Sequence, residues 1–207
     1  MSKERKISEA VVRRLPIYLR YLTYLQQVEV STVSSQQMGK HLDVNPAQIR
    51  KDLAAFGDFG RKGIGYDVDY LVENIRQILK LNSEIRVALV GAGHLGHAIS
   101  NYNVYMNDNM RIAAIFDNDP GKLGTKIAGI LIQPLEELEQ TIKAKNIRLA
   151  IMTVPAAAAQ SVCDLLVEAG IKGILNFAPT TIRAPKHVRI HYADVTSNLQ
   201  SLAFYLT

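Results

Sequence analysis

The chain contains a single cysteine and no long uninterrupted run of apolar residues. One cysteine excludes an internal disulfide, which suits a reducing compartment. No apolar run approaches the roughly 18–20 residues that a membrane-spanning helix needs. The charged start, "MSKERKISEA", is not followed by the apolar stretch of a signal peptide. We therefore expect a soluble, cytoplasmic protein that has no membrane partner.

The sequence also lacks the residue patterns that metal binding and most catalysis require. No Cys/His cluster has the spacing of zinc ligands. No Ser/His/Asp triad or pair of catalytic carboxylates can be recognised. Cys163 lies in "VCDLLV", where we expect a small core residue rather than a reactive thiol. We therefore expect no catalytic residue and no metal ligand.

Charge and residue pattern both change near residues 80–85. Residues 1–80 hold 13 Lys and Arg against 9 Asp and Glu, whereas residues 81–207 hold 11 against 10. This excess of positive charge points to an anionic partner for the N-terminal part, nucleic acid first, although it also fits a solvated basic surface. The 207 residues are enough for two small domains, which we place at residues 1–80 and 85–192.

The first 80 residues follow the order of elements in a winged helix-turn-helix. Ser8 is expected to cap a first helix, and Pro16 either breaks this helix or begins a second one. Ser34 and Gln37 have capping-box spacing for a short helix, and "DVNP" predicts a turn before the next helix, "PAQIRKDLAAF". Glycines frame "GDFGRKGIGYD" as a tight hairpin. The helix-turn-helix is placed at about residues 17–56.

Two groups of residues in this domain are candidates for DNA contacts. Ile49 and Leu53 share an apolar helix face, so the outward residues near the helix start can reach base edges and phosphates. A basic tip on a narrow hairpin can enter the minor groove. The sequence leaves open which of the two basic hairpin residues does so. The expected DNA-binding residues are Gln48, Arg50, Lys51, Arg61, Lys62 and Gly63.

The second half of the sequence predicts a parallel α/β sheet with right-handed crossovers. Short apolar segments such as "RVALV", "RIAAIF" and "RLAIMTV" are typical of strands. They alternate with helical stretches such as "PLEELEQTIKAK" and "AAAAQSVCDLLVEAG". This alternation predicts a Rossmann-like domain.

The stretch "RVALVGAGHLGHAIS" has the glycine spacing of a dinucleotide-binding turn. Gly91 allows the tight turn, Gly93 lets the backbone approach a pyrophosphate, and Gly96 lets the helix pack on the strand. The phosphates would lie on amides at the helix N-terminus, flanked by His94. Asp117 could accept from both ribose hydroxyls and repel a 2′-phosphate, which favours NAD(H) over NADP(H). A fold that binds coenzyme A or another nucleotide would fit the same glycines.

The nucleotide fold nearly uses up residues 81–207, and no segment is left for a catalytic domain. We therefore expect a protein that is not an enzyme. Two alternatives remain. One is a small NAD-dependent enzyme with its site at a dimer interface, and the other is a regulator that senses coenzyme A or another nucleotide.

Taken together, the two halves resemble Rex, a family of bacterial redox-sensing transcriptional repressors. The resemblance covers nearly the whole chain and is most specific in "QIRKDLAAFGDFGRKGIGY" (48–66), "GAGHLG" (91–96), "GIKGILNFAP" (170–179) and "ADVTSNLQSLAFYL" (193–206). It implies an α/β fold with an N-terminal winged helix-turn-helix domain, a C-terminal Rossmann-like domain and, at residues 193–207, a terminal swapped helix that makes the dimer.

The resemblance also implies ligands, partners and residue roles. Rex proteins are homodimers that bind double-stranded operator DNA when NAD⁺ prevails and release it when NADH binds. NADH and NAD⁺ would thus be sensed ligands, not reactants. Arg20 would pair with Asp194 in the DNA-binding state, and Tyr102 would reach Asp194 in the NADH state. Segments 153–155 and 176–179 would border the nicotinamide. The expected cofactor-binding residues are Gly91, Ala92, Gly93, His94, Leu95, Gly96, Asp117, Thr153, Val154, Pro155, Ala178 and Pro179.

Overall fold

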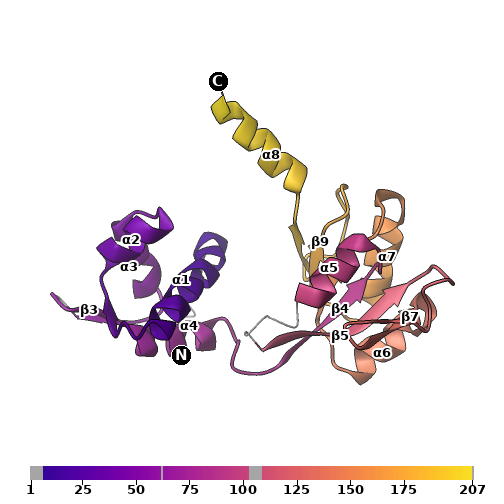
Figure 1. Cartoon of the computed structure of the whole chain (residues 1–207), viewed down its shortest axis with the longest axis horizontal. Coiled ribbons are helices and arrows are strands. Elements are labelled where there is room, and N and C mark those ends of the chain that lie inside the picture. Colours follow the sequence, from indigo (N-terminus) through magenta and orange to yellow (C-terminus); the bar gives the residue numbers. More distant parts are fainter. Residues whose placement is uncertain (1–6, 62, 103–108, 207) are drawn as a thin grey trace. The chain divides into compact units, whose positions relative to one another are not determined.

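The computed structural model describes residues 7–61, 63–102 and 109–206 (Figure 1). The chain divides into two compact units, Met1–Ser83 and Glu84–Thr207. Lys62, one of the expected DNA-binding residues, lies outside the described residues. Within the described ranges, we find no helix with the length and apolar character needed to cross a membrane.

The first unit combines helices with a small antiparallel sheet, as a winged helix-turn-helix requires. Strand β3 lies between β1 and β2 in this sheet. The turn between α2 and α3 makes the helix-turn-helix, and β2 and β3 make the hairpin that serves as its wing. The elements are α1 (Glu9–Gln27), β1 (Thr32–Val33), α2 (Ser35–Leu42), α3 (Pro46–Ala54), β2 (Gly60–Arg61), β3 (Gly65–Asp67) and α4 (Val68–Ile78).

Side-chain caps start these helices where the sequence predicts. At the start of α1, Ser8 Oγ accepts from the backbone N–H of Val11. At the start of α3, Asn45 Oδ1 accepts from the N–H of Ala47 over 2.8 Å. Ser34 and Gln37 make the reciprocal capping box of α2, with distances of 3.1 and 2.7 Å. Each side chain satisfies backbone N–H groups that the first helical turn leaves without partners.

The prediction for Pro16 is wrong, because α1 continues through it from Glu9 to Gln27. Proline removes one backbone donor, so the carbonyl of Val12 loses its helical partner. Val12 is exposed, and water can hydrate that carbonyl. The turns after Pro16 are held instead by buried contacts of Tyr18 and Leu22, whose burial outweighs the missing hydrogen bond.

The second unit contains a seven-stranded sheet in the order β10-β9-β8-β4-β5-β7-β6. Apart from the edge strand β6, the strands run parallel, and their order is that of dinucleotide-binding folds. The strands are β4 (Ile85–Val90), β5 (Met110–Asp117), β6 (Lys126–Ile127), β7 (Ile130–Pro134), β8 (Leu149–Met152), β9 (Gly173–Asn176) and β10 (Arg189–Tyr192). The helices between them are α5 (His94–Tyr102), α6 (Leu138–Ala144) and α7 (Ala156–Glu168).

The antiparallel hairpin of β6 and β7 was not predicted. Ile127 pairs with Ile130, so only Ala128 and Gly129 form the turn. Both have positive φ values, 48° and 80°, which is the geometry of a tight hairpin turn. Alanine seldom adopts this backbone conformation, and the sequence therefore carries no clear turn signal here.

The core of the second unit lies on both faces of the sheet. Ala88 and Val90 of β4 face one cluster, which includes Leu138 of α6 and Leu166 of α7. Leu89 faces the other cluster, against which Ile99 of α5 packs. Cys163 of α7 is fully buried in the first cluster, as predicted for a core residue. Burial raises the pKa of its thiol.

The last helix, α8 (Val195–Ala203), carries an apolar face that the single chain leaves uncovered. Within Val195–Ala203 no residue is buried, and Leu199 and Leu202 are each 61% exposed. The following 3₁₀ turn, Phe204–Leu206, is also exposed. A contiguous apolar surface of this kind is typical of an interface.

Candidate functional site

The candidate nucleotide site lies where the connections of the second unit change direction. β4 lies between β5 and β8, and Val90 at the end of β4 is paired with Met152 at the end of β8. Open α/β sheets bind ligands in the crevice at this point, beyond the carboxyl ends of the strands. Segments 91–96 and 153–155 follow directly on these two strands.

The three glycines of the dinucleotide-binding turn, Gly91, Gly93 and Gly96, have different surroundings. Gly91 has a φ of 103°, and a Cβ there would stand 2.7 Å from the carbonyl oxygen of Thr153. A Cβ on Gly96 would stand 2.1 Å from the carbonyl oxygen of Gly91, so α5 can approach β4 only because residue 96 is glycine. A Cβ on Gly93 would meet nothing within 4 Å. The space beside Gly93 is open, as the approach of a pyrophosphate requires.

Helix α5 begins at His94, directly after this open space. The first amides of a helix have no intrahelical acceptor and carry its positive dipole end, so they favour an anion. His94 and Leu95 are exposed. Ala92 differs from them, because its N–H donates to Asp117 Oδ2 over 2.6 Å and is not free for a phosphate.

Asp117, at the end of β5, is buried, and protein groups already occupy its carboxylate. Oδ2 accepts from the N–H of Ala92 over 2.6 Å and from Lys122 Nζ over 3.2 Å. Oδ1 accepts from the N–H of Asp119 over 2.8 Å. Burial raises the pKa of this carboxyl, but the two backbone hydrogen bonds and Lys122 together lower the pKa by more than burial raises it. The pKa is lowered overall, and Asp117 is ionised at neutral pH.

This arrangement leaves Asp117 little capacity for a ribose. A carboxylate offers about four acceptor positions, and three are taken. Acceptance by Asp117 from both ribose hydroxyls stays a prediction, and about one acceptor position is open while Lys122 is in place. Asp119 is exposed beside it, with an oxygen 3.5 Å from Lys122 Nζ. Asp119 is not among the expected site residues, although an Asp-x-Asp spacing after an apolar strand could have indicated it.

Thr153 braces the glycine turn. Its Oγ1 donates to the carbonyl oxygen of Gly91 over 2.7 Å, and its backbone N–H donates to the carbonyl of Val90 over 2.9 Å. The hydroxyl is therefore used within the protein. Val154 is half-buried, and the exposed Pro155 precedes α7.

Segment 176–179 lies beside segment 153–155, because Asn176 pairs with Met152 in the parallel ladder of β8 and β9. Asn176 is buried, and its amide shapes the segment: Oδ1 accepts from the N–H of Ala178 over 2.9 Å, and Nδ2 donates to the carbonyl of Thr180 over 3.1 Å. Ala178 is buried and Pro179 exposed. Asn176 belongs to the segment expected to border the nicotinamide but is not among the expected site residues.

The three expected switch residues all lie at the surface. Arg20 is exposed on α1, and Tyr102, the last residue of α5, is 66% exposed. Asp194 caps α8: its Oδ1 accepts from the N–H of Ser197 over 2.9 Å, and its Oδ2 from the Ser197 hydroxyl over 2.6 Å. Arg20 and Asp194 belong to different units, so their pairing stays a prediction.

The candidate DNA-binding face is the exposed side of α3. Ile49 and Asp52 are buried, whereas Arg50 and Lys51 are exposed, as the helical spacing predicts. Arg50 Nη1 donates to Ser35 Oγ over 2.9 Å and thereby connects α3 to the start of α2. Among the described residues, no group of three His, Cys, Asp or Glu side chains could hold a metal ion.

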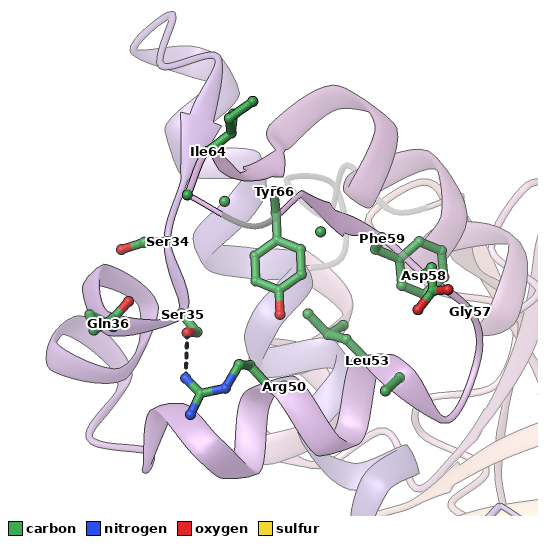
Figure 2. Close-up of a pocket in the computed structure, with 14 residues that line it drawn as sticks. Ser34, Ser35, Gln36, Arg50, Leu53, Gly57, Asp58, Phe59, Ile64 and Tyr66 are labelled. Carbon is green, nitrogen blue, oxygen red and sulfur yellow. Dashed lines mark hydrogen bonds between the residues drawn. The ribbon is translucent and has the colours of Figure 1, made fainter.

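A cavity of about 540 Å³ lies between the start of α2, α3 and the β2–β3 hairpin (Figure 2). Figure 2 shows Arg50 reaching from α3 to Ser35 along one wall. Gly63, with a φ of 85°, allows the turn of the hairpin, and Arg61 ends β2. The apolar part of the wall consists of Leu53, Ala54, Phe59, Ile64 and Tyr66, and the polar part of Ser34, Ser35, Gln36, Arg50 and Asp58.

Gln48, at the start of α3, is half-buried and already has a partner within the protein. Its Nε2 donates to Asp52 Oδ1 over 2.6 Å. Arg14 and Tyr18 of α1 donate to the same carboxylate. These three donors to Asp52 were not predicted from the sequence. The four-residue spacing of Gln48 and Asp52 on one helix could have indicated that pair, but nothing local connects them with α1.

Comparisons with known proteins agree with both halves of this description. A family described as "Putative DNA-binding protein N-terminus" matches residues 6–54, and one described as "CoA binding domain" matches residues 82–180. The redox-sensing transcriptional repressor Rex of Brevibacillus brevis is 84% identical over 207 residues, which is 100% of both chains. That of Streptomyces coelicolor is 44% identical over 99% of this chain and 79% of its own.

Solved structures give the same assignment. RSP, a Rex-family repressor, in complex with beta-NAD⁺ and operator DNA matches with a TM-score of 0.91 at 36% identity, over 98% of this chain and 94% of RSP. RSP in complex with beta-NADH matches with a TM-score of 0.88 at 34% identity, over 98% and 95%. These relatives are named repressors, which confirms the expectation that the chain is not an enzyme. The chain belongs to the Rex family of redox-sensing transcriptional repressors.

Proposed function

We propose that the chain represses transcription by binding operator DNA through its first unit, and that NADH bound in the second unit releases it. One observation carries this proposal: a winged helix-turn-helix and a sheet in dinucleotide-binding order occur in one chain, as in RSP with beta-NAD⁺ and operator DNA. NADH and NAD⁺ are then sensed ligands whose ratio sets repression.

The DNA contacts fall on α3 and the hairpin. Gln48, Arg50 and Lys51 lie on or near the outer side of the helix that enters the major groove. Arg50 is tied to Ser35 at the start of α2, a position suited to a backbone phosphate. We assign the minor-groove contacts to Arg61, Lys62 and Gly63.

The cofactor contacts surround the crevice at the end of β4. The pyrophosphate lies over Gly93 and on the amides of His94 and Leu95, where the space is open. Asp117 takes one ribose hydroxyl, and Ala92 and Thr153 hold the turn in place. Gly91 and Gly96 make the backbone approach possible. The nicotinamide is bordered by Val154, Pro155, Ala178 and Pro179.

Assembly and location follow from this role. The exposed apolar face of α8 is covered by a second copy of the chain, so the protein acts as a homodimer. As a regulator of transcription, it works in the bacterial cytoplasm. The domains that carry these roles are residues 1–80, 85–192 and 193–207.

A regulator that senses coenzyme A is the second candidate, because the family matching residues 82–180 is described as a CoA binding domain. The deciding test is a gel shift on a duplex enriched from a random pool, with NADH, NAD⁺ and coenzyme A titrated separately. We expect NADH alone to release the duplex. Release by coenzyme A and not by NADH would replace our proposal with the second candidate.

A further inference from the structure

A buried carboxylate lies directly behind the DNA-facing side of α3. Asp52 is 0% exposed. Arg14 donates to it from Nε over 2.6 Å and from Nη2 over 2.8 Å, and the Tyr18 hydroxyl donates over 2.7 Å. Gln48 Nε2 donates over 2.6 Å. Together these donors fill the roughly four acceptor positions of a carboxylate.

Asp52 is ionised in this environment. Burial raises the pKa of its carboxyl. The hydrogen bonds from Arg14, Tyr18 and Gln48 and the charge of Arg14 together lower the pKa by more than burial raises it. The carboxylate in turn raises the pKa of the Arg14 guanidinium, so both members of the pair stay charged. An ionised carboxylate can only accept hydrogen bonds, and every polar group that touches it must donate.

This requirement fixes the orientation of the Gln48 amide. An isolated amide can be turned either way, because its oxygen and nitrogen have similar shapes. Here the nitrogen must face Asp52, since the oxygen would meet another acceptor. The oxygen Oε1 and the second N–H of Gln48 remain for a partner outside the protein. Gln48 is the third residue of α3, and the first residues of such a helix contact base edges.

We propose that Asp52 is a positioning residue that orients Gln48 to read an adenine in the major groove. Adenine offers an acceptor, N7, and a donor, the N6 amino group, which match the free N–H and oxygen of the amide. Guanine offers two acceptors and would place O6 against Oε1. The inference rests on the proposed function, because it requires α3 to enter the major groove.

The two oxygens of Asp52 provide an internal control. Gln48 contacts Oδ1, whereas the Tyr18 hydroxyl contacts Oδ2. Tyr18→Phe therefore removes a donor from the buried carboxylate without touching the oxygen that orients Gln48. Asp52→Asn has a different effect, because an asparagine amide can donate toward Gln48 and lets that side chain turn round.

The experiment begins with a duplex that the full-length protein enriches from a random-sequence pool in the presence of NAD⁺. Failure to enrich any sequence would overturn the proposed function and the inference with it. Affinities are then measured for this duplex and all its single-base replacements. We expect one adenine in each half-site whose replacement weakens binding by about tenfold, the size of one good bidentate contact.

Gln48→Ala should abolish the roughly tenfold preference for this adenine. Asp52→Asn should remove most of this preference as well. Tyr18→Phe should keep it. Arg50→Ala should weaken binding to all duplexes alike, because Arg50 is proposed to contact a backbone phosphate, and such a contact carries no sequence information. The assignment of Gln48 is overturned if Gln48→Ala keeps the preference. The role of Asp52 is overturned if Asp52→Asn keeps it, or if Tyr18→Phe loses it equally.

A second variant covers the case in which Asp52→Asn does not fold, as judged by calorimetry. Glutamate in place of Gln48 offers acceptors only, so Gln48→Glu should shift the preference from adenine to cytosine, whose N4 amino group donates. Retention of the adenine preference in Gln48→Glu would contradict the proposal even though DNA binding itself persists.

Discussion

The hydroxyl of Thr153 donates to the carbonyl oxygen of Gly91 over 2.7 Å, so the residue that follows β8 holds the turn that follows β4. The backbones of the two residues are also in contact, since a Cβ on Gly91 would stand 2.7 Å from the Thr153 carbonyl oxygen. The crevice is thus shaped by protein contacts on both sides of the point where a nucleotide would bind, which is the preorganisation that tight binding requires.

Replacing Thr153 by valine tests this bracing. Valine keeps the shape of threonine but loses the donor, so the Gly91 carbonyl loses its partner. One such hydrogen bond contributes about 1 kcal/mol, and we expect NADH affinity, measured by fluorescence, to fall several-fold. Thr153→Ser retains the hydroxyl and is the matched control. Equal NADH affinity of the valine and serine variants would show that the contact does not shape the site.

Gly93 and Gly96 form a pair that separates ligand contact from packing. In Gly93→Ala the new methyl group meets no protein atom within 4 Å, so the melting temperature should be unchanged while NADH affinity falls. In Gly96→Ala the methyl group would stand 2.1 Å from the carbonyl oxygen of Gly91, so the melting temperature itself should fall. Calorimetry and NADH titration of both variants check the two effects. Unchanged NADH affinity in Gly93→Ala would contradict the placing of the pyrophosphate.

The glycine fingerprint and the sheet could be predicted from the sequence because they depend on local pattern. Gly91 follows an apolar strand and has a positive φ, and Gly96 lies close to the carbonyl oxygen of Gly91, five residues before it, whereas the space beside Gly93 is open. The partners of Asp117 could not be predicted in this way. They depend on how residues 118–122 turn back toward Ala92, which is 25 positions from Asp117 in sequence.

The first unit shows the same limit. Capping residues such as Ser34 and Asn45 act within their own helix, and their predictions are confirmed. Arg14 is 38 positions from Asp52 and Tyr18 is 34, so only the packing of α1 against α3 brings them together. Pro16 was misjudged for a related reason. Local propensity disfavours proline inside a helix, and burial of the α1 face overrides that preference.

The pKa of Asp117 predicts how stability depends on pH. Because the folded-state pKa is lowered, this carboxylate stabilises the fold fully above its unfolded value of about 4, and the contribution is lost as pH falls through the folded value. Asp117→Asn should therefore be less stable than the unmodified protein at pH 7, and the difference should shrink toward pH 3. Calorimetry at both values measures it. Asp119→Asn, at an exposed position, is the control, and an equal effect of the two variants would contradict the assigned contacts.

The apolar face of α8 predicts the state of assembly. Leu199 and Leu202 are exposed in the single chain and lie on one helix face, whereas Ser201 lies on the opposite face. The double variant Leu199→Asp, Leu202→Asp should be monomeric by light scattering, and Ser201→Asp should remain dimeric. Truncation after Asp194 should give a monomeric or aggregating protein. A well-behaved dimer after that truncation would exclude α8 as the dimer contact.

Release of DNA by NADH requires two global states, and a ligand shifts such an equilibrium only through its different affinities for them. NADH must bind the released state better than NAD⁺ does. In the proposed site, apolar residues such as Val154 and Ala178 border the nicotinamide, where the neutral ring of NADH would be buried more easily than the charged ring of NAD⁺. Coupling is reciprocal, so saturating operator DNA should weaken NADH binding by the factor by which NADH weakens DNA binding, about 5- to 150-fold.

Asp194 is the residue at which this coupling can be tested without losing the helix that carries it. Asp194→Asn keeps an oxygen that can accept from the N–H of Ser197, so the cap of α8 is preserved, but it removes the charge that Arg20 would meet. Both coupling factors should shrink together in this variant. Ser197→Ala weakens the cap and leaves the charge, and it should keep the coupling. NADH affinity is measured by fluorescence with and without saturating operator. Identical affinities in the unmodified protein would mean that the nucleotide supports the fold but carries no signal to the DNA.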